Sequence, residues 1–289
     1  MRVGFVGLGD MGAPMSKHII AGGFELTVFD LREEAMQSEA MQSLVERGAR
    51  RAADLPTLAA ASDVVFICVV NDEQVLAVVD EISAGLRRGA VVVVVSGVLP
   101  KTMEHVNAQL EPRGVAVLDG PVTGSRPEAV AGAAAGTLTM IVGGAAEIVD
   151  SVRPVLDTFA KEVIRVGTVG TGHAVKIANN MMLHMNHLIA IEAVEFAKAH
   201  GLDEQTVLKV ANVGTGRSWV TETWDLFDEM LSDHPIGIYD TMTKAMRNAV
   251  LMSKAAHVDL PLTGLGVQLS RRMLERRVAE QLASGQGQK

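Results

Sequence analysis

The segment RVGFVGLGDMG, Arg2–Gly12, combines two patterns that together decide the fold of the residues that follow. Its first half is β-branched and apolar, which is typical of a buried strand. Three glycines, Gly7, Gly9 and Gly12, follow in the spacing G-x-G-x-x-G. In a strand–turn–helix unit the first glycine permits the turn, the second lets a pyrophosphate approach, and the third lets the helix pack on the strand. We therefore predict a helix whose N-terminal amides face a phosphate group.

An acidic residue ends the next predicted strand. Asp30 closes the segment FELTVFD, 18 residues after Gly12. A carboxylate at this spacing accepts hydrogen bonds from ribose hydroxyls and repels a 2′-phosphate. Glycine-rich turns alone are common, but strand, helix and acid in this order predict dinucleotide binding. Leu31 stands where an arginine often meets the extra phosphate, and Arg32 follows it, so we predict NAD and keep NADP as possible.

Short apolar runs alternate with helical stretches through the first half of the chain. The predicted strands are Arg2–Gly7, Phe24–Asp30, Asp63–Val70, Ala90–Ser96, Val115–Gly120, Leu138–Gly144 and Glu162–Gly167. Such runs indicate a largely parallel sheet with helices on both faces, which is a doubly wound Rossmann-type α/β domain. Beyond about Gly170 the pattern is helical throughout. We predict a dinucleotide-binding domain at residues 1–166, an all-α substrate and dimerisation domain at 167–289, and a long helix joining them.

Composition and charge narrow the class of partner. The net charge of −8 argues against a nucleic-acid partner, and the most basic run, RRMLERR at Arg271–Arg277, is interpreted as the solvated face of a final helix. The longest apolar run is too short to cross a bilayer, and the N-terminus has no secretory pattern. The single cysteine, Cys68, lies among apolar residues and suits a reducing compartment. We predict a cytoplasmic protein with no membrane partner.

The segment from His173 to Ala199 is predicted as one helix with polar residues inside an apolar pattern. Lys176 and Asn180 lie four residues apart, so both reach the same small ligand. Burial lowers the pKa of a lysine and makes it usable as a base near neutral pH. His184 and His187 continue the same row, either as a pocket wall or as packing; their spacing does not favour a metal site, and none is predicted.

Three segments together carry a family resemblance. VGFVGLGDMGAPMSKHI begins at Val3, DGPVTGS begins at Asp119, and GTGHAVKIANNMM begins at Gly170. In this order they resemble the β-hydroxyacid dehydrogenases, the group of 3-hydroxyisobutyrate dehydrogenase and tartronate semialdehyde reductase, over essentially the whole chain. The resemblance implies hydride transfer between NAD and a short-chain 3-hydroxy acid, in a homodimer or homotetramer.

The resemblance also implies roles for individual residues. Lys176 matches the family's general acid/base and Asn180 its substrate-positioning residue. The substrate carboxylate is expected at Thr123, Gly124 and Ser125, where Thr123 replaces the usual serine and Ser125 replaces a glycine. Lys244 matches a lysine near nicotinamide and substrate, although Ala245 replaces the aspartate that usually follows it.

The cofactor is expected to touch the glycine-rich turn, the end of the second strand and two later loops. These residues are Gly7, Leu8, Gly9, Asp10, Met11, Gly12, Asp30, Leu31, Arg32, Val69, Val70, Gln74, Ser96, Gly97 and Lys244. Gly97 departs from the family, which more often has a threonine or serine there.

Other functions remain open at this point. Within the enzymes, an NADPH-linked semialdehyde reductase of the tartronate semialdehyde type or an imine reductase is the nearest alternative, and outside them a non-catalytic nucleotide-sensing module. Relatives with imine reductase activity or without catalysis usually lack the lysine that is present here as Lys176. Arg217 is equally consistent with a second anion contact and with a surface salt bridge.

Overall fold

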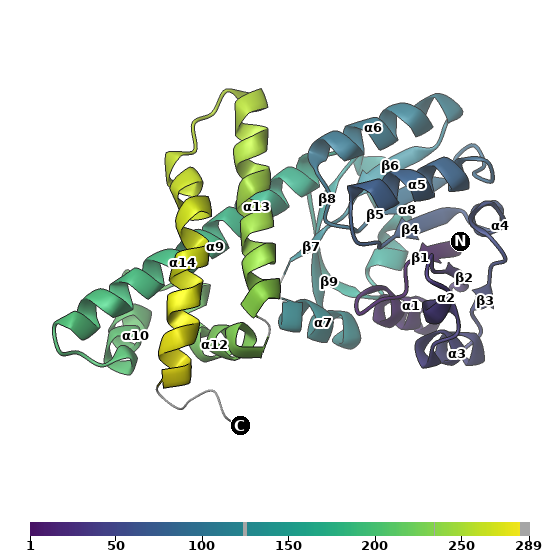
Figure 1. Cartoon of the computed structure of the whole chain (residues 1–289). Coiled ribbons are helices and arrows are strands. Elements are labelled where there is room, and N and C mark those ends of the chain that lie inside the picture. Colours follow the sequence, from purple (N-terminus) through teal and green to yellow (C-terminus); the bar gives the residue numbers. More distant parts are fainter. Residues whose placement is uncertain (124–125, 234, 284–289) are drawn as a thin grey trace. The chain divides into compact units, whose positions relative to one another are not determined.

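The computed structural model describes residues 1–123, 126–233 and 235–283 of the 289-residue chain (Figure 1). The chain forms two compact units, Met1–Lys176 and Ile177–Lys289. The division falls inside helix α9 (Thr171–Ala199), so one continuous helix begins in the first unit and ends in the second. The long joining helix predicted from the sequence is thereby confirmed, whereas the domain boundary between residues 166 and 167 stays a prediction.

The first unit is built on a nine-stranded sheet with the order β3-β2-β1-β4-β5-β6-β8-β7, and β9 pairs with β8. The strands from β3 to β6 are parallel, and β8 is antiparallel to both β6 and β7. The strands are β1 (Arg2–Val6), β2 (Glu25–Phe29), β3 (Arg50–Arg51), β4 (Val64–Ile67), β5 (Val91–Val94), β6 (Ala116–Asp119), β7 (Val122–Thr123), β8 (Leu138–Gly143) and β9 (Ala160–Gly167).

Helices cover both faces of this sheet because successive side chains of each strand point to opposite sides. On β4, Val64 and Phe66 belong to one apolar core, and Val65 and Ile67 belong to the other. The first core is shared with α1, α3, α7 and α8, and the second with α4, α5 and α6. The helices of this unit are α1 (Gly12–Ala21), α2 (Glu33–Met36), α3 (Glu39–Glu46), α4 (Leu55–Ala60), α5 (Asp72–Ser83), α6 (Pro100–Leu110), α7 (Arg126–Ala135) and α8 (Ala146–Leu156).

The doubly wound Rossmann-type domain predicted from the sequence is confirmed. Each predicted strand is present: the first six are slightly shorter than predicted, and β9 begins two residues earlier, at Ala160. Two strands were not predicted, β3 and β7, because each has only two residues and so carries no readable alternation.

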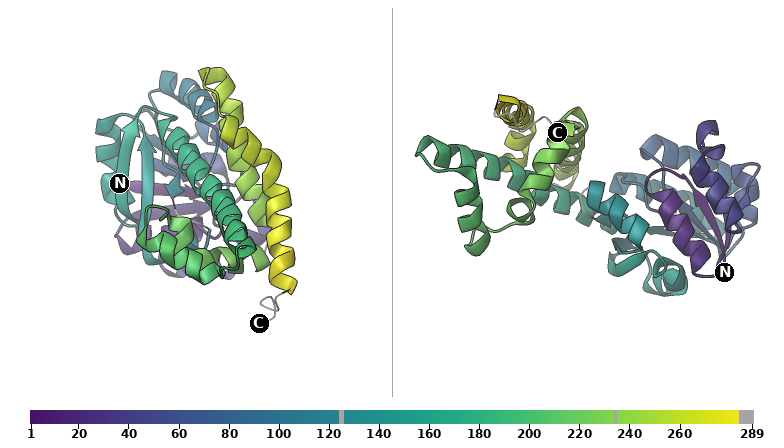
Figure 2. Two further views of the ribbon diagram at one scale, coloured as in Figure 1. Left: turned by 90° about the vertical axis from the view of Figure 1, so that its left-hand side faces the viewer. Right: turned by 90° about the horizontal axis from the view of Figure 1, so that it is seen from below.

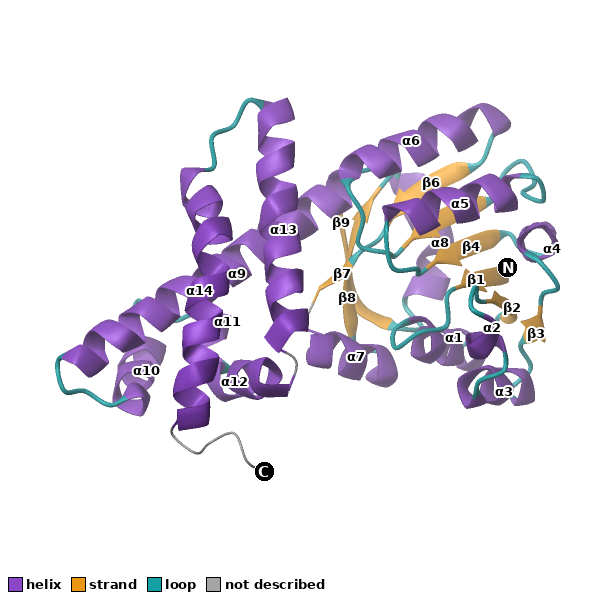
Figure 3. Ribbon diagram, in the orientation of Figure 1, coloured by secondary structure: helices purple, strands orange, loops and turns teal. Residues whose placement is uncertain are grey.

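In the second unit the described residues form helices and their connections only (Figure 3). After α9 the helices are α10 (Glu204–Val213), α11 (Trp219–Glu222), α12 (Trp224–Asp233), α13 (Pro235–Ala256) and α14 (Pro261–Ala283). α13 and α14 run side by side, as the two views of Figure 2 also show. Buried residues such as Ile191, Trp224 and Leu274 bring α9, α12 and α14 into one core. The predicted all-α second part is confirmed, and no helix of the described ranges is long and apolar enough to cross a membrane.

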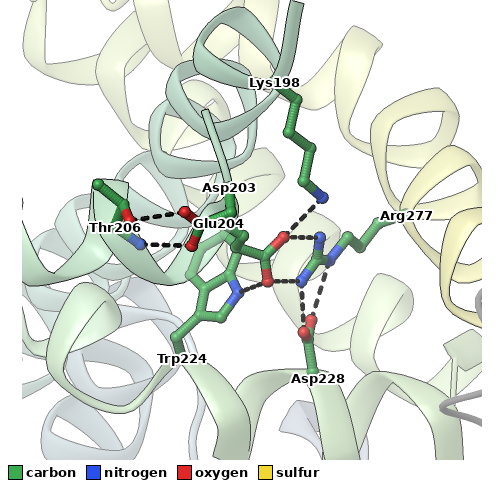
Figure 4. A network of polar contacts seen from close by, with 7 residues as sticks. All are labelled: Lys198, Asp203, Glu204, Thr206, Trp224, Asp228 and Arg277. Atoms are coloured by element: carbon green, nitrogen blue, oxygen red, sulfur yellow. Dashed lines mark hydrogen bonds and ion pairs between the residues drawn. The ribbon is translucent and has the colours of Figure 1, made fainter. Parts of the chain in front are cut away.

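A buried network of charges lies within this helical unit and corrects one prediction (Figure 4). Arg277 is 5% exposed. Its guanidinium donates two hydrogen bonds of 2.7 Å to the Glu204 carboxylate, also pairs with Asp228, and lies 5.0 Å from the centre of the Trp224 ring. The interpretation of Arg271–Arg277 as a solvated face is therefore wrong for Arg277, because carboxylates from α10 and α12 draw it into the interior.

Candidate active site

The residues singled out in the first half of the sequence gather at one edge of the sheet. The parallel strands β1, β2, β4, β5 and β6 all end there, which is where open α/β sheets bind their ligands. The segments that follow these strands contain Gly7 to Gly12, Asp30, Val69 and Val70, Ser96 and Gly97, and Asp119.

The glycine-rich turn has the geometry that its spacing predicts. Gly7 has a φ of +96°, and a Cβ atom on it would lie 2.1 Å from the Cys68 carbonyl oxygen. A Cβ on Gly12 would lie 1.9 Å from the Gly7 carbonyl oxygen, so only glycine lets α1 start here. A Cβ on Gly9, by contrast, would meet only an Arg32 nitrogen, at 4.0 Å. The backbone at Gly9 is thus open to a ligand, and the turn fits a pyrophosphate.

Asp30 binds this turn to the end of β2. Its carboxylate accepts a hydrogen bond of 2.6 Å from the Leu8 amide and another of 2.9 Å from the Arg32 amide. The Arg32 guanidinium adds two contacts at 3.1 and 3.2 Å, although its side chain is largely exposed. Burial by itself raises the pKa of Asp30, but the hydrogen bonds from Arg32 and Leu8 outweigh it and lower the pKa overall. Asp30 is therefore an ionised carboxylate that can accept hydrogen bonds from ribose hydroxyls, and Arg32 lies beside it.

Hydrogen bonds fix the loop after β4, both to the loop after β5 and to the start of α5. The Val69 amide donates to the Ser96 hydroxyl at 2.7 Å, and the Val70 amide donates to the Gln74 side chain at 2.9 Å. Gln74 thus holds the loop after β4, in addition to its predicted place beside a ribose. Burial raises the pKa of the Cys68 thiol to about 12, so this residue is a protonated packing group and no nucleophile.

The first turn of α9 is anchored to the end of β6. The Asp119 carboxylate accepts hydrogen bonds from the Gly170 amide at 2.8 Å and from the His173 amide at 2.9 Å. The His173 ring lies between Asp119, at 3.1 Å, and the Ser96 carbonyl oxygen, at 2.7 Å. His173 was not singled out from the sequence, because a histidine between matched motif positions carries no signal of its own.

Lys176 follows on the same helix, one turn after His173. Burial lowers the pKa of its ammonium to about 8, which is the shift that a base working near neutral pH needs. Asn180 is half-buried, and the Asn179 side chain donates to it at 3.4 Å. Asn180 and Lys244 belong to the second unit, where Lys244 is exposed on α13 and Ala245 after it is buried.

The remaining predicted residues differ in burial and in their contacts. Thr123 is half-buried in β7, whereas Gly124 and Ser125 lie outside the described residues. His187 is buried and packs against the Phe227 ring, with centroids 4.0 Å apart, and His184 lies next to it at 6.2 Å. Arg217 pairs with Glu222 at 3.2 Å. No group of three side chains suited to a metal ion exists in the described ranges.

A family model described as the NAD binding domain of 6-phosphogluconate dehydrogenase matches residues 2–170. A second, described as the NAD-binding part of NADP-dependent 3-hydroxyisobutyrate dehydrogenase, matches residues 170–284. The chain belongs to the β-hydroxyacid dehydrogenase family. Both models describe the binding of a nicotinamide dinucleotide, so the predicted family and cofactor are confirmed.

Three members of this family illustrate the range of similarity. An NAD-dependent L-serine dehydrogenase of Pseudomonas aeruginosa is 29% identical over 96% of this chain and 94% of its own. A 2-(hydroxymethyl)glutarate dehydrogenase of Eubacterium barkeri is 30% identical over 93% and 88%. A solved structure of Mycobacterium tuberculosis 3-hydroxyisobutyrate dehydrogenase with L-serine superposes with a TM-score of 0.83 at 27% identity, over 96% of each chain.

Proposed function

We propose that this chain is an NAD-dependent dehydrogenase of a short-chain 3-hydroxy acid, with Lys176 as the general acid/base. The observation that carries the proposal is the lowered pKa of Lys176, about 8. Lys176 lies one turn after His173, on the helix that Asp119 anchors to the carboxyl end of β6. NADP stays possible as cofactor because Arg32 contacts Asp30 at the end of β2.

Oxidation of an alcohol requires removal of a hydride from carbon and of a proton from oxygen. NAD, when bound along the glycine-rich turn and Asp30, supplies the hydride acceptor. The neutral amine of Lys176 takes the hydroxyl proton, and its ammonium returns a proton to the oxygen in the reverse reaction. Asn180, one turn further along α9, orients the substrate beside that amine.

The substrate class follows from the groups proposed to bind it. Thr123 offers a hydroxyl after β6, and Gly124 and Ser125 offer amides for a carboxylate. Lys244 supplies a second cation near the reacting carbons. The names of the relatives above contain 3-hydroxyisobutyrate and L-serine, and both compounds are 3-hydroxy acids. We therefore propose a substrate of this class.

We also propose a homodimer or homotetramer in the cytoplasm. Met182, Ile189 and Phe196 lie seven residues apart on α9 and are 62%, 58% and 68% exposed. Such spacing places three large apolar side chains on one face of the helix, and contiguous exposed apolar surface marks an interface. A second copy of the chain is the proposed partner. A monomeric mass in light scattering at micromolar concentration would contradict this.

The decisive experiment is a turnover screen of the purified chain with NAD and NADP. The substrates are 3-hydroxyisobutyrate, L-serine, glycerate, threonate and 3-hydroxypropionate. Lys176→Ala is expected to lower kcat by about 10²–10⁴-fold, the usual contribution of a positioned acid/base, with little change in the Kd for NAD. Lys161→Ala, on the exposed part of β9, is the matched control. Near-normal turnover by Lys176→Ala would exclude this role, and tight NAD binding without turnover of any substrate would favour a nucleotide-sensing module.

A further inference from the structure

A pair of fully buried polar side chains lies next to Lys176 and has no part in the mechanism above. Asp119 is 0% exposed and His173 is 1% exposed. Polar groups of this kind are costly to bury unless each hydrogen-bonding atom has a partner. Here each does, and the partners come from separate segments of the chain.

Both ring nitrogens of His173 face hydrogen-bond acceptors. Nδ1 is 3.1 Å from the Asp119 carboxylate, and Nε2 is 2.7 Å from the Ser96 carbonyl oxygen. The ring is therefore held at both of its nitrogens, between the end of β6 and the loop after β5.

The Asp119 carboxylate is satisfied in a similar way. Both of its oxygens accept backbone amides, Oδ1 from Gly170 and Oδ2 from His173. The two side chains and the first turn of α9 therefore form one hydrogen-bonded unit.

The pair connects three segments that carry proposed site residues. Ser96 follows β5 beside the expected nicotinamide ribose, Asp119 begins the segment that contains Thr123, and His173 lies one turn before Lys176. The carboxylate fits between two glycines, since a Cβ on Gly143 or on Gly172 would lie 2.2 or 2.7 Å from its oxygens. A larger residue at either position would displace the first turn of α9.

We propose that Asp119 and His173 are positioning residues, which hold Lys176 and the segments after β5 and β6 in the arrangement that hydride transfer needs. This inference rests on the proposed role of Lys176. Neither side chain touches the substrate; the pair acts through the start of α9. Displacement of a catalytic group by about 1 Å costs on the order of 10²-fold in rate, so the pair is expected to act on kcat.

The positioning role is tested by rates. His173→Gln keeps one donor and is expected to lower kcat about tenfold, and His173→Leu, which keeps none, about 100-fold, whereas KM and the Kd for NAD change less than about threefold. Asp119→Asn combined with His173→Leu should lose no more than the worse single variant, because both remove one unit. His105→Gln, at an exposed position on α6, is the control. Unchanged kcat in both His173 variants, alongside an inactive Lys176→Ala, would overturn this inference alone, whereas an active Lys176→Ala would overturn the proposed function.

Discussion

The two units bury charge in different ways. In the first unit the carboxylates of Asp30 and Asp119 lie at the ends of strands and bind backbone amides. In the second unit the Arg277 guanidinium lies among helices and binds the side chains of Glu204 and Asp228. The carboxyl edge of a parallel sheet and the first turn of a helix offer unsatisfied amides at fixed places. Helix flanks offer none, so buried charges there must find one another.

This difference explains which charges are visible in the sequence. The position of a carboxylate that directly follows a strand can be predicted from that strand, and the position of Asp30 was predicted in this way. Arg277 lies 49 and 73 residues from its two carboxylates, and nothing near it in the chain distinguishes it from Arg276. Similar substitutions should therefore have different effects on stability in the two units.

Removal of the buried arginine should have the largest effect. Arg277→Met takes the guanidinium from two carboxylates that are partly withdrawn from water, and it is expected to lower the free energy of unfolding by about 3–5 kcal/mol. Arg276→Met is the matched control, since Arg276 is exposed and pairs with Glu195 at the surface, and about 0–1 kcal/mol is expected there. Urea denaturation at one protein concentration measures both. Equal losses in the two variants would show that burial of the charge does not matter.

Within the first unit the glycines of the turn should separate stability from binding. Gly12→Ala places a Cβ against the Gly7 carbonyl oxygen and is expected to cost about 3 kcal/mol of stability. Gly9→Ala meets open space, so stability should change by about 0.5 kcal/mol or less while the Kd for NAD rises. Thermal unfolding and NAD titration together check this pair. A stable Gly12→Ala variant with normal NAD affinity would contradict the packing role.

Burial lowers the pKa of Lys176 to about 8, and this has a consequence for the rate. The base must be neutral, so kcat/KM for oxidation should rise about tenfold per pH unit up to about pH 8 and then level off. Reduction, which needs the ammonium, should show the opposite profile. Steady-state rates from pH 6 to pH 10 with 3-hydroxyisobutyrate measure this. A flat profile through pH 8 would remove Lys176 as the titrating group.

The second unit contains a group whose pKa is lowered by burial in the same way, but it affects stability. Burial, and then the neighbouring His184, lower the pKa of His187 to about 3. The unfolded chain takes up a proton at this histidine below about pH 6.5, and the folded chain does so only near pH 3, so stability falls as pH decreases between these values. From pH 7 to pH 5 the loss from His187 should be about 1–2 kcal/mol. His187→Leu should show a smaller loss, and an identical loss would assign the acid sensitivity elsewhere.

The smallest effect concerns the exposed arginine beside Asp30. Arg32→Ala should change stability by about 0.5 kcal/mol or less, because Arg32, unlike Arg277, is largely solvated. It should lower the ratio of kcat/KM with NADP to that with NAD about fivefold, since one cation near the 2′-phosphate is lost. Arg50→Ala on β3 is the control. A ratio that Arg32→Ala leaves unchanged would exclude Arg32 from the choice of cofactor.

Much of the first unit was predictable because its signals are local. A buried parallel strand is a run of apolar residues, and the turn from β1 to α1 requires glycine at particular places, as Gly7 and Gly12 show. The motif around Lys176 also marked the start of α9. The two-residue strands β3 and β7 gave no pattern, since their pairing depends on neighbours elsewhere in the chain.

The sequence by itself determined the doubly wound sheet, the glycine-rich turn, the acid that ends β2 and the family, because each depends on patterns within short continuous segments of the chain. Only the tertiary structure decided that Asp119 faces the first turn of α9, that His173 joins it to Ser96, and that Arg277 lies in the interior. These contacts join residues 49 to 77 positions apart. They form only when separate elements pack, because a charge is buried only where its partners arrive from elsewhere in the fold.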